Sequence, residues 1–217
     1  MTERRAPPSW PPERAATIPA VSAVVTLSTD APIWDRFFTV APLVIVGTRE
    51  PDGSHDLAPK HMAMPLGWQN YFCFVCSPRH ATQRNAQRTG AFTVSFPRPR
   101  QFLQISLAAA GRDEHNAKPS LAALPTRPAR TVDGVLVDDA SAWLECELER
   151  VVDGFGVNTL LVGRVVDAAV LEDAMRGPDR DDGELIDATP LLAYVSPGRF
   201  AEIASTMSFP FPADFRL

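Results

Sequence analysis

A long segment of alternating residues, Trp143 to Val152, constrains the fold more than any other part of the chain. A period of two is typical of a strand with one buried face. Gly154-Phe155-Gly156 then supplies a turn, and Thr159 to Val166 returns as an apolar strand, so the pattern predicts a β-hairpin. The alternating positions of the first strand are Leu144, Cys146 and Leu148 on one face and Glu145, Glu147 and Glu149 on the other.

Further short apolar runs predict more strands of the same kind. Leu43 to Thr48 is β-branched and predicts a central strand, and Pro51-Asp52-Gly53-Ser54 is a hairpin turn signal. His55 to Met64 would be the return strand, bent at Pro59. Hairpin connections and six or more strands favour a mainly β fold, an antiparallel barrel with attached helices, over a doubly wound sheet. The other expected strands are Val21–Leu27, Tyr71–Cys76, Ala91–Phe96 and Leu191–Val195.

Few helices are expected outside this framework. Ser28 to Asp30 can cap a short helix through Phe38, and the apolar spacing of Gln101 to Gly111 predicts another helix. Residues Asp113 to Val132 are broken by prolines and predict an excursion or lid. The acidic, glycine-containing segment Arg176 to Asp187 predicts a loop.

Length and charge limit the class of protein. The 217 residues suffice for one large domain, and we expect residues 20–217 to form it, after a Pro-, Arg- and Ala-rich mobile arm over residues 1–19. The net charge of -5 argues against a nucleic-acid partner, whose binding surface is usually basic. The chain has no apolar run of membrane-spanning length and no signal-peptide pattern, so a cytoplasmic location without membrane partners is the default expectation.

Several common kinds of site have no support in the sequence. Rossmann and P-loop glycine patterns and the G-x-S-x-G elbow are missing, and the four histidines show no H-x-x-x-H spacing, so we expect no metal site. Cys73 and Cys76 lie three apart in an expected strand and should point to opposite faces. We therefore expect buried, inert thiols rather than a disulfide or a metal pair, and Cys146 is similar.

The segment Ser77 to Asn85 has the residues of a helix start that could bind a phosphate. Ser77 is a favoured N-cap, Pro78 suits the first helical position, and Gly90 is suited to end the helix. Free N–H groups and the helix dipole favour a phosphate at such a start, and Arg79 adds a bidentate donor. The alternative is an ordinary capped surface helix. If the start binds phosphate, Arg79 and Thr82 should face ligand or solvent rather than the core.

The order of these motifs resembles the flavin reductase-like family, whose members are FMN-binding split β-barrels and include reductase partners of two-component monooxygenases. The resemblance covers roughly Asp35 to Ala204, and the order and spacing of several short motifs support it. The motifs are Ala41–Thr48, Pro51-Asp52-Gly53, Leu57-Ala58-Pro59-Lys60-His61, Thr82–Asn85 with Gly90–Val94, Leu144-Glu145-Cys146 with Leu160–Val165, and Pro190–Tyr194.

The resemblance implies an antiparallel split barrel that holds FMN between the two subunits of a homodimer. By position, one set of residues would line the flavin ring and ribityl chain: Ala58, Pro59, Lys60 and His61. A second set would hold the ribityl chain and phosphate: Ser77, Arg79, Thr82 and Asn85. Lys60 could stabilise the anionic reduced flavin, or it could be an ordinary solvated or salt-bridged lysine.

The implied activity is that of an FMN-dependent oxidoreductase. It would take electrons from NAD(P)H and pass them to free flavin or another small-molecule acceptor, with a monooxygenase as a further partner. The chain departs from the family at three positions. The family often has Asn where this chain has Asp56, and Ser or Thr where it has His61. Many reductases have a His, linked to nicotinamide binding, where this chain has Asn158. The alternatives are an FMN-binding electron carrier or sensor without NAD(P)H activity and a non-catalytic dimeric barrel.

Overall fold

The computed structural model describes residues 23–209 of the chain, which divides into two units, Met1–Ile33 and Trp34–Leu217. The described part of the first unit, residues 23–33, contains no helix or strand, so the strand expected at Val21–Leu27 is absent where it can be assessed. The mobile arm expected over residues 1–19 lies outside the described residues, and the single domain over residues 20–217 stays a prediction.

The short helix expected after Ser28 is also wrong, since residues 28–38 form only bends and a turn. The Ser28 hydroxyl accepts a hydrogen bond from the Asp30 backbone N–H at 3.2 Å and donates to the Asp30 carboxylate at 2.7 Å. Such local side-chain bonds compete with helix formation. Pro32 adds a second obstacle, because it disfavours helical geometry at the residue before it.

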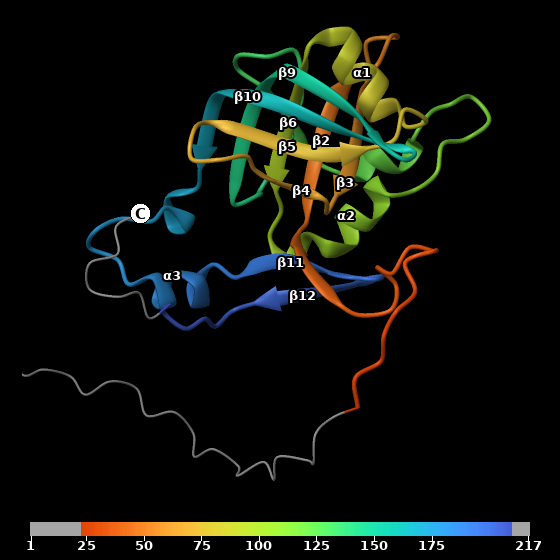
Figure 1. Ribbon diagram of the computed structural model, residues 1–217. Coiled ribbons are helices and arrows are strands. Elements are labelled where there is room, and N and C mark those ends of the chain that lie inside the picture. Colours follow the sequence, from red (N-terminus) through yellow and green to blue (C-terminus); the bar gives the residue numbers. More distant parts are fainter. Residues whose placement is uncertain (1–22, 210–217) are drawn as a thin grey trace, which may run out of the picture. The chain divides into compact units, whose positions relative to one another are not determined.

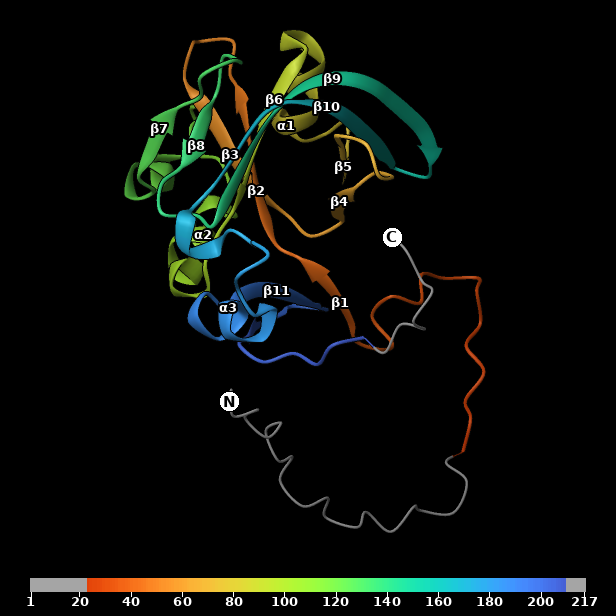
Figure 2. The same ribbon diagram turned by 90° about the vertical axis from the view of Figure 1, so that its left-hand side faces the viewer.

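Seven antiparallel strands form the main sheet, which curls into a half-barrel (Figures 1 and 2). The fold is therefore the mainly β, antiparallel split barrel that the sequence predicts. In spatial order the strands are β3 (His55–Lys60), β2 (Val44–Arg49), β6 (Ala91–Phe96), β9 (Ala142–Phe155), β10 (Asn158–Val170), β5 (Tyr71–Cys76) and β4 (Ala63–Pro65).

The β9–β10 hairpin confirms the prediction made from the alternating segment. The single return strand expected over residues 55–64, in contrast, is wrong. Its first part is β3, which pairs with β2, and its last part is β4, which pairs with β5 at the opposite edge of the sheet. The chain therefore crosses the opening of the half-barrel at His61 and Met62, between the two edge strands.

The first half of strand β2, Val44 to Val46, is apolar because both faces of the strand are buried there. Val44 and Val46 point into one hydrophobic cluster, inside the curled sheet, together with Phe72 and Phe92. Ile45 points into a second cluster on the other face. The second cluster also contains Leu57, Ile105, Ala108, Leu124, Val137 and Leu192.

Smaller elements complete the fold. A three-stranded sheet runs β1 (Thr39–Pro42), β11 (Leu191–Ser196), β12 (Arg199–Ile203), and β7 (Thr126–Pro128) pairs with β8 (Val135–Val137). The helices are α1 (Ala81–Thr89), α2 (Phe102–Ala108) and α3 (Asp182–Ala188), with 3-10 turns at Pro99–Gln101, Pro119–Ala123 and Glu172–Ala174.

Helix α3 and the short strands of these smaller sheets, β11 excepted, differ from the sequence-based expectation. Helix α3 forms where residues 176–187 were expected to be a loop, because the Asp181 carboxylate accepts a hydrogen bond from the Glu184 N–H at 3.0 Å and caps the helix. Strand β12 was not expected at all, and it pairs with β11 across a tight turn at Pro197 and Gly198. Among the described residues, no helix is long and apolar enough to cross a membrane.

Candidate functional site

A cavity of about 490 Å³ opens where the end of β3 meets the start of α1. Its third side is the segment from Ala108 to Lys118, which comprises the end of the helix expected over Gln101–Gly111 and the start of the excursion expected from Asp113. The lining residues are Asp56, Ala58, Pro59, Lys60, Arg79, His80, Ala81, Thr82, Arg84, Ala108, Ala109, Ala110, Gly111, Arg112, Asn116 and Lys118. Five of the eight residues predicted to bind cofactor are therefore among those lining it.

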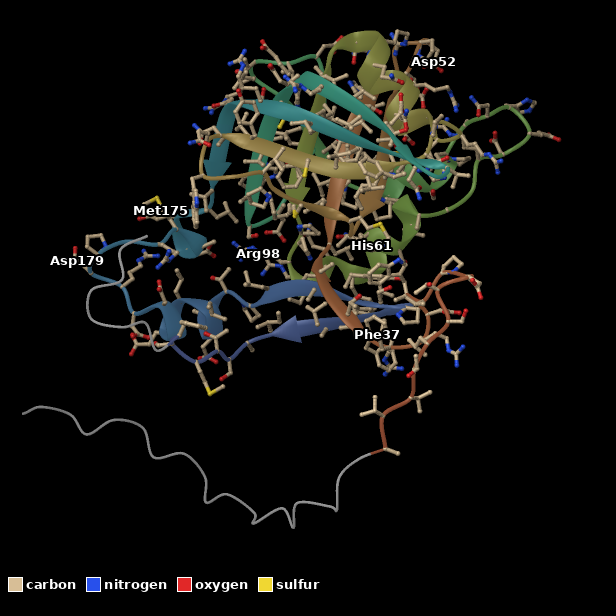
Figure 3. The ribbon with its side chains drawn as sticks, viewed as in Figure 1. Phe37, Asp52, His61, Arg98, Met175 and Asp179 are labelled. Atoms are coloured by element: carbon tan, nitrogen blue, oxygen red, sulfur yellow. The ribbon has the colours of Figure 1, made fainter. Side chains whose placement is uncertain are left out.

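Strand β3 brings Ala58, Pro59 and Lys60 to the cavity, as the sequence motif predicts. His61 follows the strand but does not line this cavity. Its ring packs on the Tyr194 ring of β11, with centroids 4.3 Å apart, and in Figure 3 it lies between the main sheet and β11. Burial, and next the charge of Lys60, lower the pKa of His61, which favours a neutral ring near pH 7.

Helix α1 begins three residues later than the sequence predicts. Its first residue is Ala81 and its N-cap is His80, so the interpretation of Ser77 as the cap is wrong. The Ser77 carbonyl accepts from the His80 N–H at 2.9 Å, and its hydroxyl accepts from the Arg79 N–H at 3.3 Å. Ser77 therefore organises a tight turn ahead of the helix and does not line the cavity.

Three cations at the cavity, Lys60, Arg79 and Arg84, have no acidic partner among the described residues. The side chains of Lys60 and Arg79 line the cavity, and neither makes an ion pair or a hydrogen bond within the part of the chain that the structure describes. Arg84 donates to the carbonyl oxygens of Pro78 at 3.2 Å and Arg79 at 2.6 Å, and so holds the turn that presents Arg79. The cavity is thus suited to an anion.

The side chain of His80 lies at the same corner. Burial, and next the positive charge of Lys60, lower the pKa of its imidazole. Its Nδ1 is 3.8 Å from the Cys76 sulfur. Near pH 7 the ring is therefore suited to act as a neutral hydrogen-bonding group, which leaves Lys60 and Arg79 as the charges available to an anion.

Thr82 and Asn85 of α1 face the protein rather than the solvent. Thr82 is 1% exposed, and its hydroxyl donates to the Asp56 carboxylate at 3.2 Å, so the expectation that it faces ligand or solvent away from the core is wrong. Asn85 is also buried and donates to the Thr48 hydroxyl at 3.3 Å. Thr82 lines the base of the cavity, whereas Asn85 lies behind it and fastens α1 to β2.

Sequence reasoning missed three charged residues of this site. Asp56, Arg112 and Lys118 line the cavity and lie in contact with one another. Asp56 is noticeable in the sequence as a departure from the family's usual Asn. Arg112 and Lys118 offer no such signal, because their role depends on how the excursion folds back onto β3.

The fold and the cavity together define a split β-barrel with a site suited to an anionic ligand. The chain matches the flavin reductase-like domain family over residues 36–198, most of its length. It belongs to the flavin reductase-like family, and a flavin-related function follows from this membership.

Solved structures agree with the fold. A nitrilotriacetate monooxygenase component B from Bacillus cereus is 19% identical, with 87% of this chain and 100% of that chain covered and a TM-score of 0.74. A putative split-barrel flavin reductase from Shewanella frigidimarina is 15% identical, with 80% and 87% covered and a TM-score of 0.70. An FMN-binding protein from Thermus thermophilus with bound p-hydroxybenzaldehyde is 21% identical, with 88% and 100% covered and a TM-score of 0.67.

Proposed function

We propose that this protein is an FMN-dependent oxidoreductase that takes electrons from NAD(P)H. One observation carries the proposal: the family's cofactor motifs converge on a cavity where Lys60 and Arg79 have no acidic partner among the described residues. An unpaired cation beside a helix start is a favourable environment for a phosphate. FMN supplies one phosphate and a ring that fits an apolar wall.

The cavity fits FMN in size and in chemistry. Its volume of about 490 Å³ falls within the range of ligand pockets, roughly 300–1,000 Å³. Arg79 would bind the phosphate, because its guanidinium is exposed and uncompensated. Ala58 and Pro59 would provide an apolar wall for the ring, and the half-buried Lys60 would place a positive charge beside it.

When bound, FMN would supply the electron-transfer chemistry itself. The part of the chain's own residues is to bind, orient and shield the cofactor. Lys60 would favour the reduced, anionic state of a flavin by charge alone, and we assign no residue to proton transfer. The wall formed by residues 108–118 would limit the access of water to one side of the cavity.

The second candidate is an FMN-binding electron carrier or sensor that uses a donor other than NAD(P)H. Asn158 favours it, because many reductases of the family have a His at this place. Asn158 is exposed at the first position of β10 and does not line the cavity. By analogy with the component B proteins, a monooxygenase could receive reduced flavin from this chain in either case.

An absorption spectrum of the purified protein, recorded without oxygen before and after addition of NADH or NADPH, tests the proposal. We expect flavin bands that bleach on addition of the donor, and heat-released cofactor that elutes as FMN. Flavin bands that bleach with dithionite but not with either nucleotide would favour the electron carrier. A protein that neither carries nor rebinds FMN would refute both.

A further inference from the structure

The cavity contains a second group of charges that the family motifs do not explain. Asp56, the second residue of β3, is 3% exposed and lies between the start of α1 and the segment 109–118. Its Oδ1 is 3.0 Å from the Arg112 guanidinium and 3.1 Å from the Lys118 ammonium. Both contacts are ion pairs.

Both cations are fully engaged by the protein. The Lys118 ammonium donates to the carbonyl oxygens of Leu57 and Ala108 at 2.9 Å each, in addition to its contact with Asp56. Arg112 donates to the Asn116 carbonyl at 2.7 Å and pairs with the Glu50 carboxylate. Two carboxylates thus balance two cations, so Arg112 and Lys118 differ from Lys60 and Arg79, which have no such partner.

These contacts attach the segment 109–118 to the neighbouring elements of the fold. Lys118 joins the end of α2, through Ala108, to β3, through Leu57 and Asp56. Arg112 makes the second attachment at the other end of the same segment. Residues 109–118 are all exposed or half-buried, and no helix or strand holds them in place.

We propose that Asp56 is a positioning residue that holds segment 109–118 as a wall of the flavin cavity, acting through Lys118 and Arg112. This inference rests on the proposed function, and it deepens it by naming what keeps the cofactor in place. The wall governs how slowly a bound flavin leaves, whereas Arg79 governs how the phosphate is recognised. Asp56 therefore acts on any ligand of the cavity, with or without a phosphate.

The variant Asp56→Asn tests this proposal by whether it makes bound flavins dissociate faster or more slowly. Asn keeps the shape and the acceptor for Thr82 but removes the charge that attracts both cations. We expect FMN and riboflavin to dissociate faster by similar factors, roughly tenfold, in stopped-flow fluorescence. A purely electrostatic role predicts the opposite, because a more positive cavity would bind FMN more tightly and leave riboflavin unchanged; that result would overturn the proposal.

Lys118→Met and a double variant test the route of the effect. Lys118→Met should also release both flavins faster, and Asp56→Asn combined with Lys118→Met should be no worse than Asp56→Asn alone, because the two side chains act as a unit. Additive losses would show that Asp56 does not act through Lys118. If Asp56→Asn does not fold, Lys118→Met and Glu50→Gln test the same proposal, and we expect each of them to release both flavins faster than the parent does.

A matched control and a flavin-free measurement complete the design. Asp139→Asn removes an exposed carboxylate paired with Arg100 outside this cavity and should leave both dissociation rates unchanged. Hydrogen exchange should show faster exchange of amides 109–118 in Asp56→Asn than in the parent. If the parent binds neither flavin, the proposed function fails. The exchange measurement still tests whether Asp56 holds the segment 109–118, and equal exchange in the two proteins would overturn that proposal.

Discussion

Charge pairing distinguishes the residues that build the cavity from those that can bind a ligand in it. Arg112 and Lys118 are cations of the same cavity as Lys60 and Arg79, yet their charge is compensated by carboxylates. A compensated cation attracts a phosphate weakly, because a nearby negative charge opposes the incoming one. Arg79 is thus the residue whose removal should matter most for an anion.

We predict that Arg79→Ala weakens FMN binding about tenfold to a hundredfold. Hydrogen bonds to charged groups contribute about 1.5–3 kcal/mol, which corresponds to that range. Fluorescence titration measures the dissociation constant. Riboflavin, which lacks the phosphate, should bind equally to parent and variant, and Arg150→Ala, an exposed arginine on β9, should bind FMN as the parent does. If Arg79→Ala weakens the binding of FMN and riboflavin equally, Arg79 does not bind the phosphate.

The three cysteines should be inert in the folded protein. All are free and buried. Burial, and next the charge of Glu145, raise the pKa of Cys146 to about 12, and burial raises the pKa of Cys73. Since the thiolate is the reactive form, a disulfide-exchange reagent at pH 8 should label no thiol within minutes in the native protein and three in denaturant. A thiol that reacts rapidly in the native protein would contradict this.

At the scale of elements, the close packing of β10 against β6 and β9 determines which residues are tolerated. Gly163 is the clearest case, because an added Cβ would lie 2.4 Å from the Phe92 ring and 2.9 Å from the Cys146 Cβ. The Phe92 ring cannot move away easily, since it is 2% exposed and packs edge-on against Phe74 at 5.1 Å. Strand β10 therefore needs a glycine at this position for space.

We predict that Gly163→Ala lowers the free energy of unfolding by about 1–3 kcal/mol, the usual effect of overpacking a core. Denaturant unfolding monitored by circular dichroism measures it. Gly177→Ala is the matched control, because an added Cβ there meets no atom within 4 Å, and its stability should match that of the parent. Equal stability of Gly163→Ala and Gly177→Ala would show that the sheet relaxes around the extra methyl group.

At the scale of the whole molecule, exposed apolar side chains point to a second subunit. Two segments carry many of them, residues 34–40 and 62–68, and Trp68 is 87% exposed, Phe38 66% and Trp34 60%. Strands β1 and β4, which belong to these segments, lie in contact. Large exposed apolar surfaces of this kind are typical of interaction sites.

We predict a homodimer that sediments at about twice the chain mass of 23.7 kDa at micromolar concentration. Trp68→Glu should shift the equilibrium towards monomer, because it places a charge in the apolar surface. Met175→Glu changes an exposed methionine outside these two segments (Figure 3) and should remain dimeric. A parent protein that sediments as a monomer would refute the prediction.

The sequence by itself determined most strands of the main sheet, the principal hairpins and the family. These depend on local features: alternation along 143–152, the Asp52-Gly53 turn, and Gly90, whose φ of 71° ends α1 as predicted. That Lys60 and Arg79 lie at one cavity agrees with the family resemblance, which implied a shared site for their motifs.

Only the tertiary structure decided which side chains of the site are available to bind a ligand. The Thr82 hydroxyl is engaged by Asp56, 26 residues away in the chain, and the Lys118 ammonium by the Leu57 carbonyl, 61 residues away. The separation of β3 from β4 likewise depends on pairing with other strands, β2 at one edge of the sheet and β5 at the other. Periodicity and capping rules act over a few residues, whereas charge compensation is a property of groups that only folding brings together.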